Sequence, residues 1–547
     1  MSERELRDDR LSAWADAVMT RRQAVVRLGL GVGVLSAGGW LAACGGDDKP
    51  AGGKVRKGGT VTIGAEEDGY TLTGDEANVG QYPLNVNIFE GLVRMDPSYG
   101  IVPVLAQSWA LRGDNTWRFK LRRGVTMHDG NPFTAESVRY TFDRVAAKGG
   151  GTPGFAKGGT RIVDDYTVDV TPTFPNQRLV EQIVHPEYAI VAAGTDPVKK
   201  PTGSGPFRLG TYERQQQLTV KRFAGYWGTP AILDELIFQF LPDANARRLA
   251  LEAGNVDVIL GVPSAMVAAL KSKGFSLYVS PAGAYEAMYA NIGGHKGYTL
   301  LQDRAVRQAI EYAIDRKALV DGVFDGQALA EQTMVPSRVL GSHASTITGY
   351  EHDPAKAQQL LEQAGWKAAG GGVRAKGGRS LELELVSGFP SAAVHSDVPE
   401  FVQDQLKRVG IGVKIVKTPD SAAYEARTGS LRGDLWLERG NQNDANPSFL
   451  PALLFSKKGL FGPGDYQTMF APGGSFDTTI NKALSARGQD EVQTLVAQAM
   501  HTLIDEEAVV VPLAGVSQIS ASTDKVKGFE AQPSALQVRY DRLGRVA

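Results

Sequence analysis

Side chains that could carry out nucleophilic, acid–base or metal chemistry are present, but none follows a recognised catalytic spacing. The chain has 7 histidines, and no two stand three or four residues apart, the spacing that presents a His pair to a metal from one helix face. There is no Gly-x-Ser-x-Gly elbow and no Walker loop. Adjacent acids such as Glu66 and Glu67 are typical of solvated loops and helix ends. The sequence thus predicts no enzyme, no cofactor and no contiguous metal motif, and leaves open a metal site gathered from distant loops.

One glycine pattern resembles a nucleotide-binding fingerprint. Gly370-x-Gly372-x-x-Ala375 has the required spacing, but a true fingerprint follows a strand and opens a helix. Here the pattern follows a predicted helix, contains Arg374 and precedes a predicted strand. We predict a glycine turn instead of a nucleotide site.

The N-terminus has the layout of an export signal. Arg21 and Arg22 precede an uncharged run over 28–43, which at about 16 residues is shorter than the roughly 20 that cross a bilayer. The twin arginines resemble a Tat signal, although Ala24 stands where a Phe is common, so export by the Sec route stays open. We predict that residues 1–43 are an export signal.

The single cysteine stands directly after this signal. Residues 41–45 read Leu-Ala-Ala-Cys-Gly and resemble a bacterial lipobox. We predict that Cys44 carries a fatty-acyl (palmitate) anchor and that 44–57, rich in Gly, Asp and Lys, form a flexible tether. The body of the protein would then be lipid-anchored to the cell membrane on its extracytoplasmic side.

Composition and charge limit the class of protein further. Of the 547 residues, 42% are hydrophobic and 22% are charged, which is enough to build cores and argues against wholesale disorder. Lys and Arg number 59 against 60 Asp and Glu, and this balance argues against nucleic acid, whose phosphates require a surplus of positive charge. The single Cys excludes internal disulfides and thiolate-rich metal sites.

Strand and helix patterns alternate along the rest of the chain and predict an α/β fold. Apolar residues at every second position, or in a continuous run, indicate strands. The predicted strands cover 60–63, 117–121, 218–221, 381–385 and 508–513. Apolar residues at i, i+3 and i+4 indicate helices with one buried stripe. The predicted helices cover 303–319, 354–364 and 490–504.

Two of these helices carry start signals. Asp353 followed by Pro354 is typical of an N-cap with proline in the first turn, and Gly365 is typical of a helix end. Asp490 with Gln493 three residues later predicts a variant of the capping box at the start of the last helix.

An ordered set of motifs resembles one protein family. Residues 87–93 read Asn-Ile-Phe-Glu-Gly-Leu-Val, 117–121 read Trp-Arg-Phe-Lys-Leu, and 128–133 read His-Asp-Gly-Asn-Pro-Phe. Pro-Thr-Gly-Ser-Gly-Pro-Phe at 201–207 and Tyr-Trp-Gly at 226–228 follow in order. This set resembles the extracytoplasmic solute-binding proteins of ABC importers, peptide/nickel cluster (bacterial solute-binding protein family 5).

The resemblance implies an α/β, two-lobed periplasmic-binding-protein type II-like fold with a third, smaller inserted domain, whose lobes close on a ligand by hinge motion. The implied division is 58–91, 200–285 and 508–547 for lobe I, 92–199 for the inserted domain, and 286–507 for lobe II. It also implies a monomer that binds a small solute, a peptide or a metal chelate, and delivers it to an ABC permease and ATPase complex.

The stretch 434–447 is similar to the place where peptide-binding relatives carry an Asp, four residues before a Pro, that pairs with the peptide ammonium. Here Asn443 stands four residues before Pro447, and Asp444 stands one step later. An amide offers no full charge, and charge-assisted hydrogen bonds are about twice as strong as neutral ones. Either Asp444 substitutes through a shifted loop, or the cargo is held without a free amine.

Nickel-chelate relatives lack that Asp and use aromatic residues near this loop together with arginines that grip the chelator. No aromatic residue lies between Gly440 and Pro447, whereas an arginine before this stretch could grip a carboxylate. The candidate ligand-binding residues are therefore Arg439, Asn441, Gln442, Asn443 and Asp444.

Two classes of function stay in view. The first is a binding lipoprotein for peptides or peptide-like solutes, with a metal chelate as the alternative cargo. The second is a secreted enzyme or a sensor on the same scaffold. A binding protein should show ligand-dependent thermal stabilisation without turnover, and an enzyme should convert its ligand.

Overall fold

The computed structural model describes the following residues: 55–66, 85–148, 155–173, 176–185, 188–197, 199–389, 397–418, 421–442, 445–457, 469–532 and 538–546. All of them lie in the unit from Gly53 to Ala547. The predicted export signal and Cys44 fall outside the described residues. Within those residues, no helix has the length and apolar character that a membrane span requires.

The first lobe is built on a mixed sheet of seven strands. In spatial order these are β13 (Ser276–Val279), β22 (Ile519–Ser522), β12 (Val258–Ile259), β2 (Thr60–Ala65), β11 (Glu235–Phe240), β10 (Gln217–Arg222) and β9 (Phe207–Glu213). The alternation predicted at the start of β2 is confirmed, because Val61 and Ile63 are fully buried. The helices of this lobe are α2 (Asn85–Ile88), α5 (Ala244–Glu252) and α6 (Ser264–Ser272).

A three-stranded sheet adjoins this lobe. It contains β1 (Val55–Arg56), β24 (Gly544–Val546) and β23 (Val526–Lys527), in that order. The prediction of a free tether through residue 57 is therefore wrong at its end, because Val55 and Arg56 pair with the C-terminal strand.

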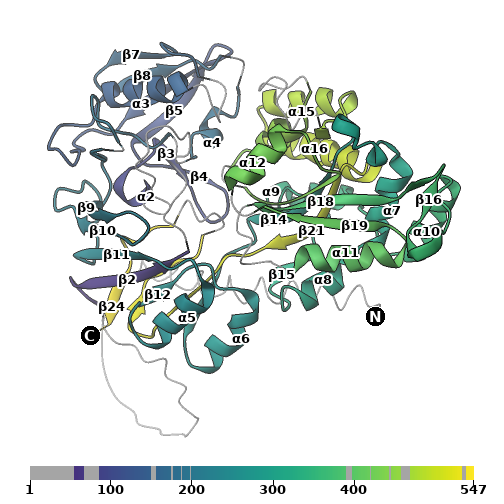
Figure 1. Cartoon of the computed structure of the whole chain (residues 1–547). Coiled ribbons are helices and arrows are strands. Elements are labelled where there is room, and N and C mark those ends of the chain that lie inside the picture. Colours follow the sequence, from purple (N-terminus) through teal and green to yellow (C-terminus); the bar gives the residue numbers. More distant parts are fainter. Residues whose placement is uncertain are drawn as a thin grey trace, which may run out of the picture. The chain divides into compact units, whose positions relative to one another are not determined.

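The second lobe is built on a sheet of six strands. In spatial order these are β15 (Ala328–Leu329), β21 (Val510–Val516), β14 (Ala284–Ala290), β20 (Leu435–Asn441), β18 (Glu382–Phe389) and β19 (Gly412–Lys417). One hydrophobic core joins the sheet to α7 (Arg304–Ala313), α8 (Arg316–Gly322), α10 (Pro354–Gln363) and α11 (Val398–Arg408). A second core joins it to α9 (Ser337–Leu340), α13 (Phe449–Phe455), α15 (Ser475–Ser485) and α16 (Gln489–His501). Helices thus cover both faces of the sheet, and α12 (Ser421–Gly429) lies beside β18 (Figure 1).

A small domain is inserted between strands of the first lobe. It begins with the hairpin of β3 (Val93–Met95) and β4 (Ile101–Pro103). Its sheet has the order β5 (Ala106–Arg112), β6 (Thr116–Leu121), β8 (Thr167–Val170) and β7 (Thr160–Asp164). Its helices are α3 (Ala135–Lys148), which buries Val138 and Phe142, and α4 (Leu179–Gln182).

Two short connections join the lobes. The chain passes from β13 to β14 through 280–283 and returns from β21 to β22 through 517–518. The connections bind each other, because Ser280 and Gln518 exchange two hydrogen bonds of 2.8 Å. Strand β21 lies beyond residue 507, where we expected lobe II to end, and every residue of it is buried. A strand that is buried on both faces needs a sheet whose two faces are both covered. The six-stranded sheet meets this need, because helices cover both of its faces.

The predicted helix over 303–319 is wrong in its middle, where the structure has two helices. Residue Ile314 is extended, and the carboxylate of Asp315 accepts a 2.9 Å hydrogen bond from the amide of Ala318, starting α8. The apolar stripe continues across the break, which hides it from periodicity. By contrast, Asp353 caps α10 as predicted, with its carboxylate 2.8 Å from the amide of Lys356.

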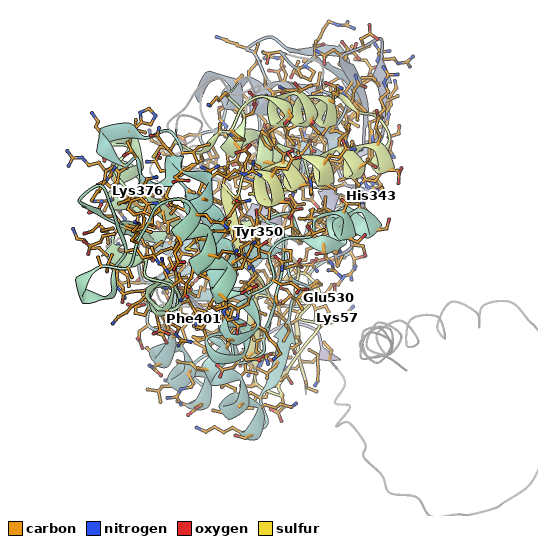
Figure 2. All side chains as sticks on the ribbon, turned by 90° about the vertical axis from the view of Figure 1, so that its right-hand side faces the viewer. Lys57, His343, Tyr350, Lys376, Phe401 and Glu530 are labelled. Carbon is orange, nitrogen blue, oxygen red and sulfur yellow. The ribbon has the colours of Figure 1, made fainter. Side chains whose placement is uncertain are left out.

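The capping box predicted at Asp490 is also wrong. Residue Gly488 holds the cap position of α16, and the carboxylate of Asp490 instead bonds His343 at 2.9 Å. The segment that carries His343 runs along α16 to Tyr350, whose hydroxyl donates to the carbonyl of Asp505 at 2.7 Å; both labelled side chains are visible in Figure 2. A contact between distant segments has displaced the local cap.

The glycine turn predicted near residue 370 is confirmed. Residues Gly370–Gly372 form a short 3-10 turn in which Gly371 has φ of 83°. It leads into a two-stranded hairpin of β16 (Ala375–Lys376) and β17 (Arg379–Ser380).

Candidate ligand-binding site

Strand β20 carries the predicted arginine from the core of the second lobe to its edge. Residues 435–438 are buried, and the three that follow are partly exposed. The last buried one, Glu438, accepts a 2.6 Å hydrogen bond from the hydroxyl of Tyr424. The next residue, Arg439, stands directly opposite Glu286 in the antiparallel register of β14. Cross-strand partners on one face interact directly.

Arg439 lies among carboxylates from both lobes. Glu286 is 4% exposed, and burial raises its pKa to about 7 while the charge of Arg439 lowers it. Burial also lowers the pKa of Arg439, and the charges of Glu286 and Glu66 act to raise it. Glu66 directly follows β2 of the first lobe. The guanidinium of Arg439, on a strand of the second lobe, therefore interacts electrostatically with one acid from each lobe.

Glu66 is held by a second arginine. Arg247 of α5 is 1% exposed, and its Nη2 lies 3.8 Å from Glu66 Oε2. The same guanidinium donates hydrogen bonds of 2.7, 2.8 and 3.0 Å to the carbonyls of Leu241, Pro242 and Gly261. These bonds fix Arg247 in place, so it positions Glu66. We call Glu66, Arg247, Glu286 and Arg439 the charge cluster.

The polar residues after Arg439 continue toward the connection between the lobes. Asn441 lies opposite Ala284, and the amide of Gln442 donates to the carbonyl of Gly283 at 2.8 Å. The side chain of Gln442 donates to the carbonyl of Asn446 at 3.2 Å. The structure thus brings Arg439, Asn441 and Gln442 to one strand end. The other two predicted residues, Asn443 and Asp444, lie outside the described residues.

Sequence reasoning missed three members of the charge cluster. Glu286 is the single acid in an otherwise uncharged, fully buried strand, which was the available signal. In the sequence, Glu66 stands out only as half of a pair of adjacent acids, and no pattern distinguishes Arg247 from the other residues of its helix. Among the residues that the structure describes, no three His, Cys, Asp or Glu side chains gather closely enough to hold a metal ion.

Comparison with known proteins matches this architecture to a family. Residues 100–461 match the family described as bacterial extracellular solute-binding proteins, family 5. The chain belongs to this family. It is a solute-binding protein of an ABC importer, extracytoplasmic by family, and not an enzyme.

The family 5 relatives cover nearly the whole chain. The glutathione-binding protein GsiB of Salmonella choleraesuis is 27% identical over 515 residues, which is 90% of this chain and 96% of the relative. NikA from Brucella suis, solved with Fe(III)-EDTA, superposes with a TM-score of 0.77 at 23% identity, over 89% of this chain and 100% of its own. DppA from Helicobacter pylori, solved with the peptide STSA, gives 0.73 at 23%, over 90% and 99%. The expected two-lobed α/β fold is confirmed.

The family 5 motifs of this chain build the scaffold. Buried Glu90 of the first motif accepts hydrogen bonds from the hydroxyls of Ser204 and Tyr226, both at 2.8 Å, and from Trp227 Nε1 at 2.7 Å. Burial raises the pKa of Glu90 although all three bonds act to lower it. A Cβ at Gly205 would lie 2.3 Å from the carbonyl oxygen of Asn87. These motifs therefore identify the fold, and they leave the cargo to other residues.

Proposed function

We propose that this protein captures peptides or peptide-like solutes between its two lobes by hinge closure and delivers them to an ABC permease. The charge cluster is the observation that carries the proposal. It combines two acids and two arginines, drawn from both lobes, at the end of the strand that carries the candidate residues. A ligand between the lobes would meet both signs of charge.

Such a cluster suits a zwitterion. A peptide offers a carboxylate, which can pair with Arg439, and an ammonium, which can pair with Glu66. Buried charges are tolerated when each is paired, and complementary potentials select the partner. A ligand that carries carboxylates alone could pair with Arg439, but it would be repelled by the charges of Glu66 and Glu286. This charge balance favours peptide-like solutes over purely anionic ones.

A metal chelate is the alternative cargo. The loss of an Asp four residues before Pro447 favours it, since Asn443 gives no full charge to an ammonium. If Asp444 substitutes for that acid, Asp444→Ala should weaken binding of an amine-bearing ligand more than it lowers the melting temperature. Equal affinity of Asp444→Ala and the unmodified chain for glutathione would remove Asp444 from the site.

We further propose that the protein works from a lipid anchor at Cys44, which keeps it near its permease. Support comes from the lipobox-like run of residues 41–45 and from the extracytoplasmic family to which the chain belongs. The solute is captured outside the membrane and handed on without chemical change.

A panel of melting experiments tests the cargo. The Cys44→Ser chain is heated with glutathione, di- and oligopeptides, or nickel with histidine, each at graded concentration. A ligand at 100 times its Kd stabilises the folded state by about 2.7 kcal/mol. Stabilisation by peptides or glutathione is the expected result. Stabilisation by the nickel–histidine mixture alone would replace the peptide proposal with the chelate one.

A further inference from the structure

We propose that the small domain carries a clasp, formed by Tyr99, Arg178 and Glu181, that holds the second lobe in its closed position and thereby sets ligand affinity. The inference rests on the proposed function, since it names what regulates the same site. Tyr99 lies between β3 and β4, and Arg178 and Glu181 lie at α4; Figure 1 labels these elements in the small domain.

The first contact is polar. Arg178 stands directly before α4, and its side chain is 5% exposed. Its guanidinium lies 3.1 Å from the carboxylate of Glu181 and also donates to the side-chain oxygen of Gln489, the first residue of α16. The partners are 311 residues apart in the chain, Arg178 in the small domain and Gln489 in the second lobe. Opening of the lobes would break this hydrogen bond.

The second contact lies beside the candidate ligand residues. Ala445 follows β20 of the second lobe, yet it is 4% exposed and belongs to the hydrophobic core of the small domain. Its amide donates to the carbonyl of Glu181 at 3.4 Å. On the other side, the amide of Gln442 binds the carbonyl of Gly283 in the connection between the lobes. The interlobe connection therefore holds Gln442, and the small domain holds Ala445.

The third contact is a strained aromatic side chain. Tyr99 lies at the tip of the β3–β4 hairpin and packs against the cores of both the small domain and the second lobe. Its φ is 64°, a left-handed conformation that costs a residue with a side chain roughly 1–2 kcal/mol. The carboxylate of Asp96 holds the tip by accepting hydrogen bonds of 2.8 and 2.9 Å from the amides of Ser98 and Gly100. A strained residue persists where surrounding contacts determine it, and such residues gather at functional sites.

These contacts join the small domain to the second lobe without using the charge cluster. The apparent Kd of a binding protein is its intrinsic Kd divided by the fraction of molecules in the competent, closed form, so a smaller closed fraction weakens binding. Residues of the clasp therefore change affinity by changing that fraction. They are positioning residues, and their loss should mainly increase the rate of ligand dissociation.

The test compares two exposed glutamines on the same helix. In the full chain, Gln489→Ala removes the acceptor of Arg178, and Gln498→Ala is the matched control; both residues are exposed on α16. With glutathione as the calorimetric probe, Gln489→Ala should raise Kd about three- to ten-fold with an unchanged urea midpoint, and Gln498→Ala should change neither. Gln489→Glu keeps an acceptor for Arg178 and should restore the affinity. Equal Kd values for the Gln489→Ala and Gln498→Ala chains would overturn the clasp.

A second measurement separates the clasp from the proposed function. If the unmodified chain binds neither glutathione nor peptides, the cargo proposal fails, and small-angle scattering of the ligand-free protein then decides the clasp. The radius of gyration should be larger for Gln489→Ala and for Tyr99→Ala than for Gln498→Ala. Equal radii for the three variants would overturn the clasp whatever the cargo is.

Discussion

A single methyl group at Gly440 should disturb the strand that carries the candidate site. Gly440 lies opposite Tyr285 in the register of β20 and β14, and the tyrosine ring covers it. A Cβ at this position would lie 2.1 Å from both Cζ and the hydroxyl oxygen of Tyr285. Non-bonded carbons need about 3.5–4.0 Å, so the ring would have to move by roughly 1.5 Å. The ring is 2% exposed, and its hydroxyl bonds that of Tyr289 at 2.9 Å, so little space is open to it.

The magnitude follows from two opposing effects. Overpacking a dense core costs about 1–3 kcal/mol. Replacing glycine with alanine inside a regular element contributes about 0.5–1 kcal/mol in the other direction, because the unfolded chain loses freedom. We therefore expect Gly440→Ala to lower the free energy of unfolding by about 1–2 kcal/mol. The assay is urea unfolding followed by tryptophan fluorescence.

A matched control and a double-mutant cycle complete the experiment. Gly322→Ala, at the end of α8 with no atom within 4 Å of the added Cβ, should be neutral or stabilising by up to about 1 kcal/mol. Tyr285→Leu removes the clashing atoms, so its combination with Gly440→Ala should show a coupling of at least about 1 kcal/mol. Strictly additive effects, or a Gly440→Ala chain as stable as the unmodified one, would refute the steric argument.

Three further predictions concern burial and the anchor. Arg316 pairs with buried Glu311 and donates to three backbone carbonyls, so Arg316→Met should lower the free energy of unfolding by about 3–5 kcal/mol, and Arg316→Met with Glu311→Leu should recover most of that loss in urea unfolding. Burial lowers the pKa of His185 to about 4, so the unfolded state, whose His pKa is near 6.5, binds the extra proton as pH falls from about 6.5 to 4. The free energy of unfolding should therefore fall over that range. Between pH 7 and pH 4.5, the urea midpoint of the His185→Gln chain should fall less than that of the unmodified chain. Equal changes in the two midpoints would contradict the lowered pKa. Cys44→Ser should release the protein from isolated membranes into the soluble fraction, and unchanged retention would contradict the lipid anchor.

Patterns that depend on near neighbours in the chain were the ones that sequence predicted well. The cap of α10 needs only Asp353 and an amide three residues later, and both are local. The alternation predicted over 381–385, at the start of β18, buries Leu381, Leu383 and Leu385 as expected. Each of these features is set by a period of two or by a single turn, and no distant partner competes with it.

Predictions failed where a distant segment competes for a local group. Asp490 was expected to cap its own helix, but His343, 147 residues earlier, takes the carboxylate. The need for glycine at position 205 likewise has a distant cause, because the backbone of Asn87 approaches too closely for a Cβ. Neither close approach leaves a mark in the sequence around it.

The candidate site divides in the same way. Order and type of residues along the chain were enough to indicate the family, the choice of Arg439 as a candidate and the absence of enzyme motifs. The electrostatic influence of Glu286 and Glu66 on that arginine required the folded chain, because the three groups come from separate strands or strand ends in two sheets. Electrostatic interactions depend on distance in space and on burial, and the linear order of residues encodes neither.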